Sequence, residues 1–465
     1  MGDGTSTKTS VGRGKGARAP TIATRQGPIL ETPTCRDKGS KFPARRSLVE
    51  FDPGGAIRNR RVAIVGAGAA GTLAAIFAAT AGAETLLLER TRDGGRKILI
   101  SGGGRCNILP ARVDERRFVT DSSPNTLRKI LRSWPLAEQV AFFERGLGMP
   151  LVEEQESAKL FPASHRARDV RDGLLTLAAR AGARFVPDTL VTGIAPRAGR
   201  WEVEREGAAP LVVDAVVVAT GGLSVPNTGS DGRGIAILRA LGHTMHPTYA
   251  ALTPIVAGPS PFGALAGVSL PVTLSASGDH RHSASSGGFL FTHRGYSGPS
   301  VLDVSHVLVR SRQEADGTAR LTVRWTARDE ASWESALQPV GTRTVAGVLR
   351  RNLPERLADS LAMQAGVAAS HPLAQLRRED RLRLISVLVR GELPWVGDEG
   401  YRKAEVTGGG VSLAEIDPRT MESRRHPRLF ICGEVLDAFG PIGGYNFLWA
   451  WATGRAAGEA AARSA

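Results

Sequence analysis

Three glycines and one acidic residue between positions 66 and 89 have the spacing of a dinucleotide-binding motif. Gly66, Gly68 and Gly71 follow the pattern G-x-G-x-x-G, and Glu89 comes 18 residues after the last glycine. In such a motif the first glycine permits a tight turn, the second lets a pyrophosphate approach the backbone, and the third lets a helix pack closely on a strand. The acidic residue accepts hydrogen bonds from ribose hydroxyls and disfavours a 2′-phosphate. These residues therefore predict FAD or NAD rather than NADP.

The elements needed to position these residues are present in the right order. Residues 62–65 are an uninterrupted apolar run, which is typical of a buried parallel strand. An alanine-rich segment up to about residue 81 predicts a helix, whose N-terminal N–H groups and dipole favour phosphate. A second apolar strand, residues 85–88, ends at Glu89. This context favours a dinucleotide site over the alternative, a tight turn that binds no ligand.

A second glycine-rich segment, residues 94–107, follows the first motif directly and reads GGRKILISGGGRCN. Consecutive glycines can form a nest of N–H groups for an anion, and Arg96, Lys97 and Arg105 add positive charge. We expect this segment to wrap the pyrophosphate and ribityl chain of a flavin; the alternative is a flexible surface loop. We interpret Cys106 as a small packed residue rather than a nucleophile.

The middle of the chain divides into three patterns. Residues 126–182 read mainly as helical, with a polar excursion around residues 153–156. Residues 184–186, 190–194, 201–206 and 211–218 read as short strands of an antiparallel β-meander. The sequence ATGG at 219–222 then predicts a second approach of the backbone to the nucleotide, before a helix at 235–241. Residues 244–328 alternate like strands, and residues 340–390 have helical spacing. Within that part His293, Arg294 and Tyr296 either face a substrate or belong to a solvated turn.

The C-terminal segment predicts a return to the cofactor. Residues 429–432 read as a buried strand that leads into Gly433 and Glu434, which could bind a ribityl hydroxyl. The sequence GPIGGYN at 440–446 opens a long helix that runs to about residue 462. The N-terminus of such a helix can stabilise negative charge on the pyrimidine edge of a reduced flavin. A flavin site divided between both ends of the chain is therefore the economical interpretation.

Composition sets further bounds on the 465-residue chain. A hydrophobic content of 42% and a charged content of 23% are ordinary for a globular protein. There is no apolar run long enough for a transmembrane helix, so we expect no membrane partner and a cytoplasmic location. The three cysteines are far apart, which disfavours a disulfide framework, a zinc site or a redox dithiol. The net charge of +15 comes in part from a basic, apolar-poor tail, and nucleic acid is disfavoured as a partner because no nucleic-acid motif accompanies the charge.

Together these segments resemble the BaiN-type family of NAD(P)/FAD-dependent oxidoreductases. The segments that carry the resemblance are VGAGAAG (65–71), GGRKILISGGGRCN (94–107), ATGGLSVPNTGSDG (219–232), FLFTHRGYSGP (289–299), AEVTGGGVSLAEIDPRTMES (404–423) and GEVLDAFGPIGGYNFLWAWATG (433–454).

The resemblance implies an α/β fold, with a Rossmann-like FAD-binding domain that carries a β-meander and is interrupted by an inserted domain, part β-barrel-like and part helical. We accordingly expect a disordered basic tail at 1–55, the FAD-binding domain at 56–242 and 400–465, and an inserted substrate or cap domain at 243–399. The motifs and the resemblance together predict FAD as the cofactor and the following cofactor-binding residues: Gly66, Gly68, Ala69, Ala70, Gly71, Glu89, Arg90, Gly95, Arg96, Lys97, Ser101, Gly102, Gly103, Gly104, Arg105, Cys106, Asn107, Val191, Ala219, Thr220, Gly221, Gly222, Gly433, Glu434, Gly443, Gly444, Tyr445 and Asn446.

The predicted activity is hydride transfer between flavin N5 and a small organic substrate. The sequence leaves the electron donor open, and if NAD(P)H is the donor we expect it to bind transiently over the flavin, because no second G-x-G-x-x-G opens a helix. No catalytic acid or base stands out in the sequence. Two alternatives remain open: a flavin-dependent enzyme that acts on tRNA, and a non-catalytic FAD-binding redox sensor.

Overall fold

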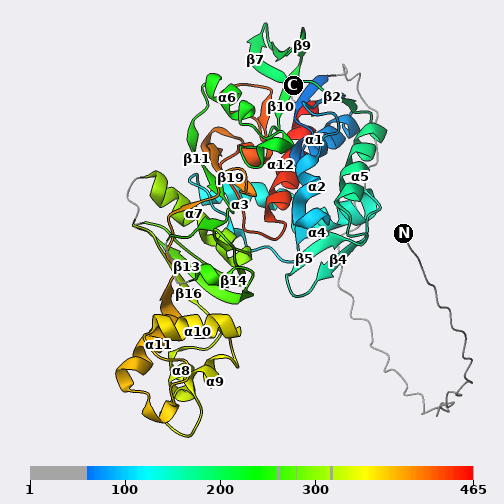
Figure 1. Cartoon of the computed structure of the whole chain (residues 1–465). Helices are drawn as coiled ribbons and strands as arrows, with labels where there is room; N and C mark the ends of the chain where they lie inside the picture. Colours follow the sequence, from blue (N-terminus) through cyan, green and yellow to red (C-terminus); the bar gives the residue numbers. More distant parts are fainter. Residues whose placement is uncertain (1–59, 259–261, 279, 315–317, 464–465) are drawn as a thin grey trace, which may run out of the picture. The chain divides into compact units, whose positions relative to one another are not determined.

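The structure is a computed structural model that describes residues 60–258, 262–278, 280–314 and 318–463 (Figure 1). The predicted disordered tail, residues 1–55, lies outside the described residues. None of the helices in these described ranges is long and apolar enough to cross a membrane.

A five-stranded parallel sheet carries the glycine motif. β1 (Arg61–Val65) lies at its centre, and the order across the sheet is β20-β10-β1-β2-β6. Every residue of β10 is buried, as are all but the first residues of β1 and β2, which agrees with strands covered on both faces. The last strand of the chain pairs with β10 and so joins the sheet of the first motif. The other four strands are β2 (Glu84–Leu88), β6 (Arg184–Val186), β10 (Ala215–Val218) and β20 (Leu429–Ile431).

Two helices from opposite ends of the sequence pack side by side against this sheet. α1 (Ala69–Thr80) contacts β1, and α12 (Tyr445–Arg463) contacts β10 and β20 (Figure 1). Glycines allow the two helices to touch, since a Cβ on Gly454 would lie 2.3 Å from the Ala70 carbonyl oxygen. The predicted helices at both ends of the chain are confirmed. α2 (Arg96–Ile100) and α5 (Ala167–Arg180) pack against each other, α5 also contacts α1, and α6 (Arg233–Ala240) follows the ATGG segment.

The predicted β-meander is confirmed for an antiparallel sheet of β7 (Val191–Arg197), β8 (Arg200–Arg205) and β9 (Ala208–Val213). Its first predicted strand, residues 184–186, was wrongly assigned to the meander, because it is β6 and pairs in parallel with β2. The strand predicted at 211–218 is in fact two strands, β9 and β10, which belong to different sheets. Asp214 separates them, and its carboxylate accepts a hydrogen bond of 2.8 Å from the Arg61 N–H at the start of β1.

The prediction that residues 126–182 are mainly helical was wrong in their middle part. α3 (Pro124–Arg132), α4 (Leu136–Ala141) and the π-helical turn Phe142–Gly146 are followed by two strands, β4 (Leu151–Glu154) and β5 (Lys159–Pro162). These pair in a small sheet with β3 (Leu109–Pro110). The chain reverses at Ala158, whose φ of 50° is incompatible with a helix. β4 is only half-buried, so its hydrophobic pattern is weak.

Residues 255–398 form a separate seven-stranded antiparallel sheet. Its order is β17-β16-β13-β14-β15-β12-β18. The strands are β12 (Ile255–Val256), β13 (Ser269–Ser277), β14 (His282–Phe291), β15 (Gly295–Ser297), β16 (Arg320–Arg324), β17 (Gly391–Glu392) and β18 (Gly397–Asp398).

Helices cover this second sheet and extend beyond it (Figure 1). α7 (Pro299–Gln313) lies against β13 and β14 in a region predicted to be all strands. Its side chains are buried on nearly every side, so the sequence lacks the polar face that marks an amphipathic helix. The predicted helical part is confirmed by α8 (Glu330–Ala336), α9 (Val345–Leu349), α10 (Glu355–Gln364) and α11 (Arg378–Arg390).

The buried side chains form two main hydrophobic cores, one around the parallel sheet and one around the seven-stranded sheet and its helices. β11 (Met245–Ala251) comes before the second sheet in the sequence and β19 (Val406–Val411) comes after it. The two strands pair in antiparallel fashion and so bring the two ends of that segment together. The domain boundaries at 56, 243 and 399 stay a prediction.

The contact between α1 and α12 gives a first testable prediction. Gly454→Val would drive a side chain into the backbone of α1, and overpacking of this kind costs at least about 1–3 kcal/mol. We expect a corresponding loss in the free energy of unfolding, measured by chemical denaturation. Ala460→Val on the partly exposed face of the same helix is the control and should change it by less than about 1 kcal/mol. Equal effects of the two substitutions would contradict the close contact.

Candidate functional site

A cavity of about 670 Å³ lies at the carboxyl ends of the parallel strands. Pockets of this size hold cofactors and drug-sized ligands. The structure brings most of the predicted cofactor-binding residues to its wall, although they come from distant parts of the sequence. The predicted residues that line it are Gly66, Gly68, Ala69, Ala70, Glu89, Arg90, Gly95, Arg96, Lys97, Ser101, Gly102, Gly103, Arg105, Asn107, Val191, Ala219, Thr220, Gly221, Gly433, Glu434, Gly443, Gly444 and Asn446.

The three motif glycines have three different environments. Gly66 has a φ of 101°, and a Cβ there would lie 2.7 Å from the Ala219 carbonyl oxygen. A Cβ on Gly71 would lie 1.8 Å from the Gly66 carbonyl oxygen, so this glycine packs the helix onto the turn. Gly68 faces the cavity, and a Cβ there would meet no atom within 4 Å. The turn and the packing thus require Gly66 and Gly71, whereas Gly68 leaves open space at the N-terminus of α1.

Glu89 fixes the end of β2 beside this turn. Its side chain is 7% exposed, and Oε2 accepts a hydrogen bond of 2.7 Å from the Ala67 N–H. Oε1 accepts hydrogen bonds from the Thr91 N–H (2.8 Å) and the Thr91 hydroxyl (2.7 Å). A carboxylate has about four lone-pair sites, so capacity for a ribose hydroxyl remains. Glu89 therefore supports the motif structurally as well as lining the cavity.

The basic glycine-rich segment folds as a short helix, α2, followed by a glycine turn. Gly102, Gly103 and Gly104 all have positive φ, from 55° to 83°, so a run of backbone here takes the left-handed conformation. The predicted cations are partly neutralised by carboxylates that the sequence did not connect to them. Arg96 Nε donates to Asp93 (2.8 Å), and Arg105 Nη1 donates to Glu154 (2.9 Å).

Lys97 joins the segment after β2 to the C-terminal part of the chain. Its Nζ donates to Glu434 Oε2 (2.5 Å) and also contacts the Ser224 hydroxyl. Ser224 Oγ donates to Glu434 Oε1 (2.6 Å), which also accepts from the Thr407 N–H (3.0 Å). Four chain segments thus meet at one carboxylate in the cavity wall. Glu434, predicted to meet a ribityl hydroxyl, is already held in place by these contacts.

Five predicted residues do not line the cavity. Gly71 packs against the turn, as described. A Cβ on Gly222 would lie 2.3 Å from Thr407 Oγ1, and Gly104 is exposed. Cys106 is fully buried, and burial raises the pKa of its thiol to about 12, in agreement with its interpretation as a packed residue. The Tyr445 hydroxyl donates to the Arg112 carbonyl oxygen (3.2 Å), away from the cavity.

The structure also adds residues that sequence reasoning missed. Lys159 and Phe161 line the cavity from β5, which was predicted to be helical. Glu405 lies within the segment AEVTGGG, so it was part of the quoted resemblance but carried no signal of a role. Pro299 and Leu302 line it from α7, which was not predicted. The other added lining residues are Val65, Leu88, Ile98, Ile100, Thr189, Leu190, Val225, Thr228, Gly229, Ser230, Asp231, Arg233, Gly234, Ile237, Val406, Ala438, Ile442, Phe447, Trp449 and Ala450.

The three residues of the inserted part that could have faced a substrate do not line this cavity. Tyr296 is buried, and its hydroxyl donates to the Pro394 carbonyl oxygen (3.1 Å). His293 is exposed, and the Arg294 side chain is 68% exposed. The alternative of a solvated turn therefore fits His293 and Arg294, whereas Tyr296 is packed in the second hydrophobic core.

Comparison with known proteins identifies the family. The sequence model described as HI0933-like protein Rossmann domain matches residues 60–460. The chain belongs to the HI0933-like family. This family match confirms the resemblance inferred from the motifs, and with it the Rossmann-type FAD-binding fold and FAD as the cofactor. The protein is an FAD-dependent oxidoreductase.

Relatives with assigned names match along almost their whole length. The chain is 32% identical over 408 residues to the ribosomal RNA dihydrouridine synthase of Escherichia coli. The aligned region covers 84% of this chain and 95% of that relative. It is 30% identical over 410 residues to the 3-dehydro-bile acid delta(4,6)-reductase of Clostridium scindens, covering 86% and 99%. Among solved structures, a 3-ketosteroid-delta4-(5alpha)-dehydrogenase from Rhodococcus jostii RHA1 has 17% identity and a TM-score of 0.45, covering 87% of this chain and 98% of the other.

The residues of the cavity wall fit the FAD that this family binds, because the N-termini of two helices line the cavity. The open space in front of Gly68 lies at the N-terminus of α1, where backbone N–H groups and the helix dipole favour phosphate. At another part of the wall, Gly443 and Gly444 precede α12, and Ile442 N–H donates to Asp303 Oδ1 (2.8 Å) on α7. Both helix starts therefore face the same cavity, one from each end of the sequence.

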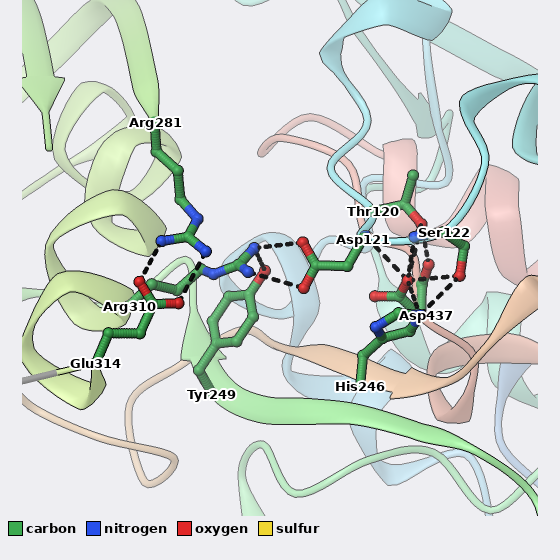
Figure 2. A network of polar contacts seen from close by, with 9 residues as sticks. All are labelled: Thr120, Asp121, Ser122, His246, Tyr249, Arg281, Arg310, Glu314 and Asp437. Carbon is green, nitrogen blue, oxygen red and sulfur yellow. Dashed lines mark hydrogen bonds and ion pairs between the residues drawn. The ribbon is translucent and has the colours of Figure 1, made fainter. Parts of the chain in front are cut away.

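A buried polar network fixes the loop that leads into α12 (Figure 2). Asp437 is 1% exposed, and its Oδ2 accepts hydrogen bonds from the Asp121 N–H (3.0 Å) and from the Ser122 N–H and hydroxyl (both 2.8 Å). Asp121 in turn receives two hydrogen bonds from Arg310 of α7 (2.9 and 2.8 Å). The guanidinium of Arg310 also lies 4.9 Å from the centre of the Tyr249 ring. These contacts tie the cofactor part of the chain to α7 and β11.

A second buried cluster has the residue types of a hydrolytic triad but serves the structure. His243 Nδ1 lies 2.8 Å from Glu415 Oε2, and His243 Nε2 lies 3.2 Å from the Ser423 hydroxyl. Ser423 is 5% exposed, and its oxygen accepts hydrogen bonds from the Arg425 and His426 N–H groups (both 3.1 Å). A hydroxyl that is buried and occupied in this way cannot attack a substrate.

The first prediction for this site separates the folding role of a glycine from its binding role. Gly68→Glu should leave the apoprotein folded, because its Cβ would meet no protein atom, yet should abolish FAD binding by filling the space in front of α1. Gly71→Ala should instead unfold the apoprotein, because its Cβ would overlap the Gly66 carbonyl oxygen. Thermal unfolding and titration with FAD measure the two effects. Full FAD occupancy in Gly68→Glu would place the cofactor elsewhere.

The second prediction concerns acid stability. Burial opposes ionisation of Glu415, but hydrogen bonds from Thr244, Arg425 and His243 outweigh it and lower its pKa from 4.5 to about 2. A lowered folded-state pKa stabilises the protein above pH 4.5, and this stabilisation is lost as the pH falls towards 2. Glu415→Gln should therefore be less stable than the wild type at neutral pH, with a difference that shrinks between pH 4.5 and 2. The exposed Glu392→Gln is the control, and a pH-independent difference for Glu415→Gln would refute the assignment.

Proposed function

We propose that this protein uses FAD to reduce a carbon–carbon double bond that is conjugated to a carbonyl group. The observation that carries the proposal is the cavity itself, which extends from the dinucleotide turn to a wall that bears an acid and a cation, Glu405 and Lys159. The names of two relatives support the same chemistry. A dihydrouridine synthase saturates a ring bond conjugated to a uracil carbonyl, and a delta(4,6)-reductase of a 3-dehydro-bile acid saturates bonds conjugated to a ketone.

The residues of the chain would divide the work along the cavity. When bound, FAD supplies the hydride. The turn at Gly66–Gly71 and the N-terminus of α1 would hold the pyrophosphate, and Glu89 would accept a hydrogen bond from the ribose. Glu434, which is held by Lys97, would meet the ribityl chain. The start of α12 lines the same cavity, and its N-terminal dipole would favour negative charge on a flavin bound there.

Two substrate classes fit this chemistry. Uridine within ribosomal RNA is supported by the net charge of +15 and by the relatives in Escherichia coli and Haemophilus influenzae that bear that name, at 32% and 31% identity. A small conjugated ketone is supported by the bile-acid relative at 30% identity and belongs to the class of small organic substrates expected from the sequence. RNA was disfavoured from the sequence because no nucleic-acid motif is present, and an enzyme that reads a single unstacked base does not require one.

NAD(P)H is the proposed donor, bound transiently over the flavin. Among the described residues, the spacing G-x-G-x-x-G between a parallel strand and a helix occurs at Gly66–Gly71 alone. The glycine run 408–410 belongs to the buried strand β19, which pairs with β11, so it is not available as a second nucleotide turn. A cytoplasmic location likewise remains a proposal.

The test is a two-stage anaerobic experiment on the FAD-loaded enzyme. Bleaching of the flavin spectrum by NADH or NADPH would identify the donor. The reduced enzyme is then mixed with ribosomal RNA lacking dihydrouridine, or with a 3-keto-4,6-diene bile acid, and we expect one of them to restore the oxidised spectrum. The saturated counterpart of each compound is the control, because it has no bond to reduce. A flavin that neither compound reoxidises would contradict the proposal and favour the redox sensor.

A further inference from the structure

The charged residues that line the cavity are nearly all paired within the described part of the chain. Glu89 is held by backbone and hydroxyl donors, and Lys97 pairs with Glu434. The other paired residues are Arg90 and Arg233 with Asp231, Arg96 with Asp93, and Arg105 with Glu154. Two lining charges remain for which the structure shows no hydrogen bond or ion pair of the side chain, Glu405 and Lys159. An unpaired charge inside a cavity is costly unless a ligand meets it.

Glu405 lines the cavity and is exposed. It precedes β19, and its backbone is fixed on both sides, since its N–H donates to the Leu252 carbonyl oxygen (3.1 Å) and its carbonyl accepts from the Ser224 hydroxyl (3.3 Å). Its side chain is accessible, yet protein atoms surround the space into which it opens. The backbone is therefore held while the carboxyl group is left free to meet a ligand.

Lys159 lines the same cavity from another sheet, that of β3, β5 and β4. It lies on β5, beside the Gly443 turn, where a Cβ on Gly443 would lie 3.8 Å from Lys159 Cε. Lys159 and Glu405 have opposite charges and interact electrostatically, but they do not form an ion pair with each other. A gap between two such groups is the arrangement expected where a polar substrate group enters between them.

We propose, on the basis of the function above, that Lys159 binds the carbonyl oxygen of the substrate and that Glu405 donates the proton that completes the reduction. The hydride that reduced FAD would supply forms a C–H bond at the carbon β to the carbonyl. The π electrons of the double bond shift towards the carbonyl oxygen, where the ammonium of Lys159 stabilises the negative charge. The α carbon then takes a proton from Glu405, which is left as a carboxylate, FAD is left oxidised, and solvent reprotonates Glu405.

The surroundings of Glu405 suit a proton donor. Burial raises the pKa of its carboxyl group, Lys159 and Lys97 oppose the rise, and the carboxylate of Asp303 adds to it. A raised pKa increases the protonated fraction near neutral pH, which general acid catalysis requires. Reduction of the substrate should accordingly slow as the pH rises through the pKa of Glu405.

The neighbouring groups fit the role less well. Asp303 is 10% exposed, and its carboxylate already accepts from the Ile442 N–H (2.8 Å) and the Ser285 hydroxyl (3.0 Å) and pairs with Arg117. Lys97 is occupied by Glu434 and Ser224. Both hold the cavity wall, whereas Glu405 and Lys159 are available to the substrate.

Two measurements test the pair without turnover, in the FAD-loaded enzyme. An infrared titration should show a protonated-carboxyl band that disappears in Glu405→Gln and persists in the exposed control Glu392→Gln. The oxidised enzyme should bind 4-chlorophenolate, a planar anion that resembles the charged carbonyl oxygen, with a charge-transfer absorbance. Lys159→Met should weaken that binding about ten- to hundredfold, Lys159→Arg should retain it, and the exposed control Lys129→Met should not change it. FAD affinity should stay within about twofold in all variants.

Half-reactions then separate this inference from the proposed function. Reduction of the flavin by NAD(P)H should be unchanged in Glu405→Gln. Reoxidation by the acceptor should be slower by about a hundredfold or more, and its rate should no longer fall as the pH rises. A wild type that no conjugated acceptor reoxidises defeats the proposed function. An active wild type with an unaffected Glu405→Gln, or loss of FAD binding in either variant, defeats the acid–cation pair. If the wild type does not bind the phenolate, or if Lys159→Met binds it equally well, Lys159 does not bind the carbonyl oxygen of the substrate.

Discussion

The close contact between α1 and α12 is the constraint on which the cofactor site depends. The two helices start at opposite ends of the sequence, and their N-termini bound one cavity only because Gly454 and Gly458 let α12 lie against the α1 backbone at Ala70 and Ala74. A side chain at either glycine would push the helices apart and separate the two halves of the site. β20 reinforces the arrangement by adding the C-terminal segment to the parallel sheet beside β10.

Electrostatic pairing shapes the inside of this cavity. A basic wall alone would bind many anions, but here most of the cations are matched by carboxylates from other segments, as Lys97 is by Glu434. Such pairs hold segments in register more than they add stability, because desolvation offsets their attraction. Glu405 and Lys159 are the two lining charges without a paired side chain among the described residues, and they have opposite signs. A site that neutralises its structural charges and leaves one acid and one cation free is suited to polarising a neutral substrate.

The sequence predicted the parts of the site that depend on local patterns. The glycine turn, its flanking strands and the long final helix each have a periodicity or spacing that a short window reveals, and all are confirmed. The strands β4 and β5 were missed because Leu151–Glu154 is half-exposed, and α7 was missed because burial on nearly every side removes its amphipathic signal. Lys159, Pro299 and Leu302 lie on those missed elements, so their place in the cavity could not be predicted. Glu405 was missed for another reason, since only the tertiary fold shows that a cavity lies in front of it.

A crystal structure of the FAD-loaded protein would test the account most directly. We expect density for the pyrophosphate in the space before Gly68 and density for the flavin ring where Gly443 precedes α12, with Glu405 and Lys159 on the exposed side of the ring. Density with the adenine at the Gly443 end, or a ring that covers no part of the wall formed by Glu405 and Lys159, would contradict it.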